Sequence, residues 1–318
     1  MIPELDELLD RLHVVALPMR VRFRGITVRE VALIDGPAGW GEFGAFTEYE
    51  PPEAVHWLAS GVESAYGTTP PPLRDAIPVN ATVPAVGPDE VPGVLARFPG
   101  ATTAKVKVAE PGQRLADDVA RVEAVRALIP TVRVDANGGW TVREAVTASR
   151  ALTAGGPLEY LEQPCRTVAE LAELRALIDV PVAADESIRK ASDPLAVMRA
   201  KAADIAVLKV APLGGVRAML DIAAQIDIPV VVSSALDSAV GISAGLAAAA
   251  ALPELPFACG LATGGLFVED VIDRPAGGTL PVGPVCPDPA RLAGLAAPAG
   301  RRDWWLSRTV ECYRLLAR

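Results

Sequence analysis

The chain of 318 residues is poor in the residue types that build thiolate, disulfide or histidine sites. It contains four cysteines, which lie far apart and form no C-x-x-C pair, and only two histidines. Neither a disulfide framework nor a zinc knuckle is therefore indicated. Reduced thiols are typical of a cytoplasmic protein, and this is the location that we predict.

Positive charge and long apolar runs are also scarce. The chain has 39 acidic and 30 basic residues, a formal net charge of −9. Because a negative surface repels phosphate backbones and anionic lipids, we expect no nucleic-acid partner and no membrane partner. The first ten residues are acidic, so we expect no export signal. The uncharged stretch 238–253 is shorter than the roughly 20 residues of a membrane helix and predicts a buried helix. No protein partner can be inferred from the sequence.

From Ile77 onward, short runs rich in valine, isoleucine and leucine alternate with helical patterns. Two helical patterns open with capping boxes, Thr141-x-x-Glu144 and Thr167-x-x-Glu170. This alternation predicts an α/β fold, a modified (β/α) TIM-type barrel of (β/α)7β type over residues 76–287. An open Rossmann-like sheet is the alternative. The predicted strands are Ile77–Val83, Thr103–Val108, Val132–Asp135, Leu158–Glu162, Val180–Ala184, Ile205–Val210, Pro229–Ser233 and Phe257–Leu261.

Residues 1–75 follow a different pattern. Alternating side chains predict antiparallel strands over Arg20–Val31 and Val31–Gly36, and Pro51–Tyr66 has the spacing of an amphipathic helix. We therefore predict an N-terminal α+β capping domain, joined to the barrel through the stiff linker Pro70–Pro72. The tail 288–318 carries a helical stripe and is expected to pack back on the cap and complete it.

Lysine is rare among the basic residues, yet it occurs inside predicted strands. Only five of the 30 basic residues are lysines. Lys105 and Lys107 share one face of a strand because side chains alternate with a period of two, and Lys209 lies in another strand. A buried ammonium is costly unless it is paired. A desolvated lysine can lose its proton and act as a base, which arginine cannot. These three lysines are therefore candidate catalytic residues.

Acidic residues close three consecutive predicted strands. Asp135, Glu162 and Asp185 stand at these strand ends, and Lys209 follows at the next equivalent position. One acid at a strand end is more often a helix cap, but the regular spacing favours a shared site at the C-terminal mouth of a barrel. Convergent carboxylates require a cation, and oxygen ligands suit Mg²⁺ rather than zinc. Arg133 lies on the same strand face as Asp135 and is expected to be a charge partner of the acids.

Together these residues resemble the enolase superfamily in its muconate-lactonizing subgroup. The resemblance covers the whole barrel and rests on Lys105-x-Lys107, Val134–Asn137, Leu161–Pro164, Asp185–Ser187 and Lys209. Shorter motifs agree with it, namely Arg24–Glu30, Gly39–Phe43, Glu162–Cys165 and Gly260–Gly264. The resemblance implies proton abstraction next to a carboxylate group. It also implies Mg²⁺, for which Mn²⁺ can substitute, with Asp135, Glu162 and Asp185 as its ligands.

The resemblance further implies a small-molecule carboxylate as substrate. This would be 2-succinyl-6-hydroxy-2,4-cyclohexadiene-1-carboxylate, dehydrated to an aromatic product in menaquinone biosynthesis. Lys107 would take the α-proton and return it to the departing hydroxyl group on the same face. Lys105 would hold the carboxylate, and Lys209 would stabilise the anion from across the ring.

The remaining implied residues surround this centre. Ser233 and Gly260 would contact the succinyl arm, and Asn137 would support the ligand set. Arg20, beside Met19, would lie in a cap loop that closes over the site. The alternative is an N-acylamino acid racemase or dipeptide epimerase of the same superfamily, which uses the same lysine sites. A barrel without catalytic activity is disfavoured, since every ligand and lysine position is present in the sequence.

Overall fold

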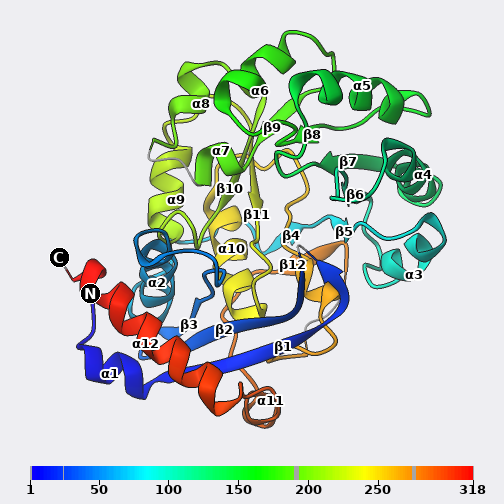
Figure 1. The fold of residues 1–318 in the computed structure, drawn as a ribbon. Helices are drawn as coiled ribbons and strands as arrows, with labels where there is room; N and C mark the ends of the chain where they lie inside the picture. Colours follow the sequence, from blue (N-terminus) through cyan, green and yellow to red (C-terminus); the bar gives the residue numbers. More distant parts are fainter. Residues whose placement is uncertain (1, 24, 190–192, 274–276, 318) are drawn as a thin grey trace.

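A curled parallel sheet lies at the centre of the molecule (Figure 1). The computed structural model describes residues 2–23, 25–189, 193–273 and 277–317. Strands that are neighbours in this sheet are also neighbours in the chain, so the described part shows none of the order reversal of a Rossmann-like sheet. The barrel prediction is confirmed. The strands are β5 (Ala81–Val83), β6 (Thr103–Lys107), β7 (Thr131–Asp135), β8 (Leu161–Glu162), β9 (Val182–Ala184), β10 (Ile205–Lys209) and β11 (Val230–Ser233).

Single bridges link the two edges of this sheet. Ser233 of β11 forms a parallel bridge to Gly260, and Val79 forms one to Cys259. The segment predicted as the last strand, Phe257–Leu261, is thus reduced to isolated bridges, although it occupies the closing position.

The predicted strand Ile77–Val83 is wrong as a single element. Its first half is β4 (Ala76–Pro78), which pairs antiparallel with β12 (Thr279–Pro281) outside the barrel. Only β5 joins the parallel sheet, where it pairs with β6. The chain changes partners at Pro78, whose carbonyl accepts from the Cys259 amide at 2.8 Å, and the next bond of this kind runs from the Asn80 amide to the Cys259 carbonyl at 3.0 Å.

Helices alternate with the strands and surround the sheet (Figure 1). Both predicted capping boxes are present: Thr141 Oγ1 accepts from the Glu144 amide, and Thr167 Oγ1 accepts from the Glu170 amide. Each such cap stabilises its helix by about 1 kcal/mol. The uncharged stretch 238–253 forms a largely buried helix, as predicted. The barrel helices are α3 (Val91–Leu95), α4 (Leu115–Arg126), α5 (Val142–Thr153), α6 (Val168–Arg175), α7 (Glu186–Arg189), α8 (Ala196–Arg199), α9 (Val216–Ala223) and α10 (Ala239–Ala251), with 3₁₀ turns at Pro88–Glu90 and Thr263–Leu266.

The N-terminal region forms an antiparallel sheet with one long helix. Its strands are β1 (Leu12–Phe23), β2 (Ile26–Gly36) and β3 (Gly39–Phe43), and α2 (Pro51–Tyr66) packs on β3 with the predicted bounds. The predicted strand Arg20–Val31 is wrong, because the chain reverses inside it. Gly25 has φ 79°, a left-handed conformation that glycine adopts readily, and this allows the tight reversal. Arg24 lies outside the described residues.

The tail returns to the N-terminal region. It contains α11 (Pro289–Gly294) and α12 (Ala299–Leu316), and α12 packs on α2 and on α1 (Leu5–Asp10). Trp305 is fully buried, and its ring meets Phe43 edge to face at 5.4 Å. The Tyr313 hydroxyl donates to the Pro3 carbonyl at 2.8 Å, so both ends of the chain lie side by side (Figure 1). The domain bounds, 1–75 with 288–318 and 76–287, stay a prediction.

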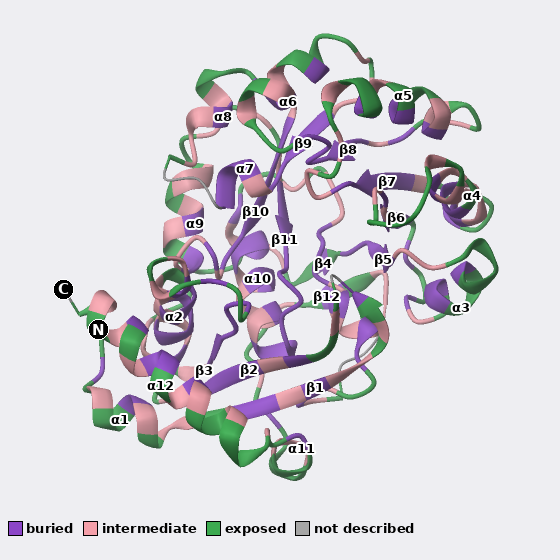
Figure 2. Ribbon diagram, viewed as in Figure 1, coloured by how far each residue is buried: buried purple, intermediate pink, exposed green. Residues whose placement is uncertain are grey.

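The distribution of buried residues agrees with this arrangement of sheet and helices (Figure 2). The strands of the central sheet are buried along most of their length, whereas the outer helices have exposed faces. Among the helices of the described residues, none has both the length and the apolar character needed to span a bilayer.

Candidate active site

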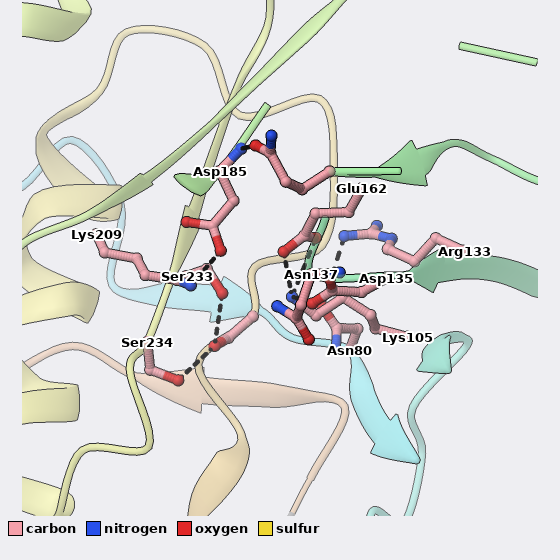
Figure 3. Close-up of polar contacts among 12 residues, drawn as sticks. Asn80, Lys105, Arg133, Asp135, Asn137, Glu162, Asp185, Lys209, Ser233 and Ser234 are labelled. Carbon is pink, nitrogen blue, oxygen red and sulfur yellow. Dashed lines mark hydrogen bonds and ion pairs between the residues drawn. The ribbon is translucent and has the colours of Figure 1, made fainter. Parts of the chain in front are cut away.

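The three predicted acids lie together at the C-terminal ends of adjacent strands (Figure 3). Asp135 ends β7 and stands opposite Glu162, which ends β8, while Asp185 directly follows β9. Their exposed fractions are 1%, 1% and 0%. Three carboxylates buried at one edge of a sheet need positive charge close by.

Lysines supply that charge on the β6 side. Lys105 Nζ lies 2.8 Å from Glu162 Oε1 and 3.5 Å from Asp135 Oδ2. Lys107 Nζ donates to the same Asp135 oxygen and, at 2.9 Å, to Asn137 Oδ1. Asn137 has φ 48°, and its own amide donates to Asp135 Oδ1 at 3.0 Å. The two lysines and two acids therefore form one continuous ion-pair cluster.

Asp185 is held between two cations. Lys209 Nζ donates to Asp185 Oδ2 at 2.5 Å, and Arg189 Nε donates to Asp185 Oδ1 at 2.9 Å. Arg189 also donates to Glu186 Oε1 at 2.7 Å and to the Tyr49 hydroxyl at 3.2 Å. Sequence reasoning missed Arg189, although its spacing of four residues from Asp185 on a short helix was a signal.

The buried charges change one another's proton affinity. Burial and the neighbouring Asp135 carboxylate raise the pKa of Glu162 to about 7, although Lys105 acts in the opposite direction. Burial works against the Lys105 ammonium, but Glu162 and Asp135 raise the pKa of Lys105 well above its usual range. Burial likewise opposes ionisation of Asp135, yet Lys107 and Lys105 lower the pKa of Asp135 far below its ordinary value. Lys209 and Arg189 do the same for the pKa of Asp185 against its burial.

Gln163 joins the ends of β8 and β9, a role that sequence reasoning missed. Its Oε1 accepts from the amides of Asp185 and Ser187 at 3.0 and 3.1 Å. Its Nε2 donates to the Cys165 carbonyl at 2.8 Å and to Ser187 Oγ at 2.7 Å. The side chain is fully buried, and φ is 37°. Gln163 therefore fixes the backbone from which Glu162 and Asp185 project.

Replacing Gln163 by alanine should destabilise the fold. The change leaves buried backbone amides without acceptors, each costing about 1–3 kcal/mol. We expect a lower denaturation midpoint in urea with an unchanged slope. Gln225→Ala is the matched control, because the exposed Gln225 amide donates only to the Asp221 carbonyl in the described structure and its loss should stay within about 0.5 kcal/mol. Equal midpoints for the two variants would contradict this role.

A small cavity of about 30 Å³ lies beside the lysines. Of the residues predicted to bind substrate, Ser233 and Gly260 line it. A Cβ atom at position 260 would stand 2.3 Å from Ser233 Oγ, so this approach requires glycine. The three lysines and Asn137 also line it, as do several residues that sequence reasoning missed, namely Phe23, Phe46, Thr82, Ser234, Ala235, Leu236 and Thr263.

Two predicted residues lie elsewhere. Arg20 donates to the Val268 carbonyl at 3.0 Å and lines a separate cavity, so this structure does not bring it to the lysines. Arg133 donates to Glu159 at 2.7 Å and to the Tyr160 hydroxyl at 2.7 Å. It is fully buried, and these hydrogen bonds lead to Glu159 and Tyr160 rather than to the three acids expected for it.

The donor set fits a hard divalent cation in its chemistry. Among the described residues, no three histidine, cysteine or acidic side chains lie close enough together to coordinate a metal ion as they stand. The lysines instead hold the oxygens of Asp135, Glu162 and Asp185. All three donors are carboxylates, the ligand type that suits Mg²⁺, and the charges of Asp135 and Asp185 both act on Glu162.

Comparison with known proteins agrees with this architecture. A family model described as enolase C-terminal domain-like matches residues 95–278, and one described as enolase N-terminal domain-like matches residues 14–65. The chain is 73% identical over 317 residues to o-succinylbenzoate synthase from Mycolicibacterium smegmatis, covering 99% of each chain. The chain belongs to the o-succinylbenzoate synthase family of the enolase superfamily. A second family member, from Mycobacterium leprae, is 73% identical over 318 residues, covering 99% of this chain and 95% of that protein.

Solved structures support the fold of this family member. The muconate lactonizing enzyme from Pseudomonas fluorescens, complexed with muconolactone, has a TM-score of 0.74 at 23% identity, covering 90% of this chain and 98% of that one. The L-Ala-D/L-Glu epimerase from Bacillus subtilis has a TM-score of 0.72 at 22% identity, covering 87% and 96%. At these identities the likeness concerns the fold alone.

Proposed function

We propose that this protein is a hydro-lyase that dehydrates 2-succinyl-6-hydroxy-2,4-cyclohexadiene-1-carboxylate to o-succinylbenzoate with the help of Mg²⁺. The observation that carries this proposal is the 73% identity to o-succinylbenzoate synthases over nearly the whole chain. The lysines that line one cavity support it, because elimination next to a carboxylate needs a base and cations.

Asp135, Glu162 and Asp185 would hold the metal ion. Bound there, Mg²⁺ or Mn²⁺ would supply positive charge that stabilises the negative charge developing on the substrate carboxylate. Both oxygens of Asp185 are hydrogen-bonded in this structure, Oδ1 to Arg189 and Oδ2 to Lys209, so Asp185 would exchange one of these contacts for the metal ion. Asn137 and Gln163 would keep Asp135, Glu162 and Asp185 in place through their backbone and side-chain hydrogen bonds.

Lys107 is the proposed base. Its ammonium is held by Asp135 and Asn137 in this structure. With Asp135 holding the metal ion, its carboxylate would stabilise the Lys107 ammonium less, and Lys107 would lose a proton more readily. Neutral Lys107 would take the α-proton and then protonate the hydroxyl group that leaves from the same face.

The other two lysines act through charge. Lys105, which its neighbours keep positive, would bind the substrate carboxylate. Lys209 stands on β10, across the sheet from β6, and would stabilise the planar anion from the other side. Ser233 and Gly260 would border the succinyl arm.

A direct substrate comparison tests the proposal. The kcat/KM for the cyclohexadiene carboxylate should exceed that for every member of a panel of N-acylamino acids and dipeptides. The reverse ranking would favour a racemase or epimerase and would defeat the proposed function.

Lys209→Arg should separate dehydration from racemisation. In a one-face elimination Lys209 supplies only charge, whereas a racemase needs a proton donor on each face. The variant should keep a measurable part of its dehydration rate, reduced by imperfect placement of the larger cation. Any racemisation of an N-succinylamino acid, followed by solvent deuterium exchange, should vanish. Complete loss of dehydration with racemisation retained would contradict the assigned role.

A further inference from the structure

Two cap motifs have no part in the proposed mechanism, yet one residue of each is hydrogen-bonded to the barrel domain. Arg29 belongs to β2 and Glu42 to β3, within the motifs Arg24–Glu30 and Gly39–Phe43. Their exposed fractions are 3% and 6%. Because a buried charge is costly without partners, the contacts of these two side chains indicate what they do.

Arg29 links the barrel to the cap with one guanidinium group. Its Nε donates to the Leu236 carbonyl at 3.0 Å, across the interface. Its Nη2 donates to the Gly44 carbonyl, and its Cζ atom lies 4.6 Å from the centroid of the Phe46 ring. A planar group with several donors can satisfy these contacts at once, whereas an ammonium cannot.

Glu42 anchors the same stretch of barrel. Its Oε2 accepts from the Ser238 amide at 3.0 Å, from Ser238 Oγ at 2.5 Å and from the Gly241 amide at 3.3 Å. Asp237 is buried beside these groups, and its charge acts on both Glu42 and Arg29. The cap thus holds the segment 235–238, between β11 and α10, at two points.

This segment forms part of the active-site wall. Ala235 and Leu236 line the cavity beside the lysines, and Phe46 lines it from the cap. Leu236 has φ 62°, a left-handed conformation that is unfavourable for a residue with a side chain. Such a conformation persists only where the surroundings hold it, and the bond from Arg29 to the Leu236 carbonyl is one such restraint.

We propose that Arg29 is a positioning residue that determines substrate specificity, because it ties the Leu236 backbone to Phe46 and so sets the space that the cavity offers. The inference rests on the proposed function. Both walls line the cavity beside the lysines, so a shift of either one changes the space next to them. A fixed spacing between the two walls favours a flat ring over a flexible N-acylamino acid. One pocket contact discriminates between two substrates by about 10- to 200-fold.

Arg29→Lys tests this role. The variant keeps a positive charge between Glu42 and Asp237 but loses the planar group that joins Leu236 to Phe46. We expect KM for the cyclohexadiene carboxylate to rise about tenfold with kcat nearly unchanged. The ratio of kcat/KM for this substrate to kcat/KM for an N-succinylamino acid should fall by about the same factor.

Arg301→Lys is the matched control. Arg301 Nε donates to Glu30 at 2.9 Å, and its Cζ atom lies 4.5 Å from the Trp304 ring centroid, but it does not line the cavity. This variant should keep the wild-type KM and selectivity ratio. An unchanged ratio in Arg29→Lys, or an equal loss for both substrates, would overturn the inference.

If Arg29→Lys does not fold, the variant Leu236→Gly provides a second test. Glycine adopts a φ of this kind without strain, so Leu236→Gly removes the wall side chain at little backbone cost. A lowered selectivity ratio would support the role of the wall, and an unchanged ratio would overturn it.

Wild-type protein measured in parallel reports separately on the proposed function. If wild type does not dehydrate the cyclohexadiene carboxylate, the proposed function fails; if only the variant ratios are unchanged, the specificity role fails.

Discussion

Lys107→Arg is expected to lose nearly all dehydration activity, with kcat reduced about 10²- to 10⁴-fold, the usual contribution of a general base. The substitution keeps the positive charge beside Asp135, but a guanidinium group cannot become neutral at the pH of the assay. The loss should therefore be nearly as large as in Lys107→Ala. Steady-state kinetics with Mg²⁺ present measures it, and circular dichroism verifies the fold.

Lys105→Arg is the control on the same strand face. Lys105 stands two residues away, pairs with Glu162 and is assigned only a charge role. An arginine can fill that role, so this variant should lose much less activity than Lys107→Arg. If Lys107→Arg retained most of the wild-type rate, the base would have to be another residue.

Asp135→Asn should abolish activity by removing one carboxylate of the proposed metal site. Loss of an outer-shell partner already weakens metal binding by about 10- to 100-fold, so loss of a ligand should weaken it more than about 100-fold. Titration calorimetry with Mg²⁺ measures the affinity independently of catalysis. The variant should stay folded, because asparagine is close in size to aspartate.

Asp117→Asn provides the comparison for that result. Asp117 is an acid of the first turn of α4, where it accepts from the Arg114 amide at 2.8 Å and forms an ion pair with Arg114. Its replacement should leave Mg²⁺ affinity and kcat unchanged. Equal Mg²⁺ affinity in Asp135→Asn and wild type would contradict the assignment of Asp135 as a ligand.

The site could be predicted where it follows from the repeat of the chain. Asp135, Glu162 and Asp185 are found together because equivalent strand ends meet at one edge of a parallel sheet, and the spacing of the sequence reports that equivalence. Lys105 and Lys107 share a face for the same local reason. These placements need no knowledge of tertiary contacts.

Most of the missed residues depend on contacts between distant segments. Gln163 acts across neighbouring strands, and no local pattern distinguishes it from other polar residues. Arg189 is the exception, because its spacing of four residues from Asp185 is a local signal. Phe23 and Leu236 border the cavity only because the cap and the barrel meet there. Arg20 was assigned through a family loop, whose position does not follow from sequence pattern.

For the fold as well, elements with local signals could be predicted and those that depend on distant contacts could not. The helix Pro51–Tyr66 was predicted with its full bounds, because the prolines at its start and its apolar spacing are local signals. The interruption of Ile77–Val83 was missed, since the strand pairs with Thr279–Pro281, some 200 residues away in the chain. A partner at that separation leaves no local signal in the run itself.

The most direct test of the account follows aromatisation of the cyclohexadiene carboxylate by ultraviolet absorbance, using wild-type protein depleted of metal by exhaustive chelation. We expect no turnover until Mg²⁺ is added, and then saturable dehydration to o-succinylbenzoate. Full turnover by the metal-free protein, or no dehydration at saturating Mg²⁺, would contradict it.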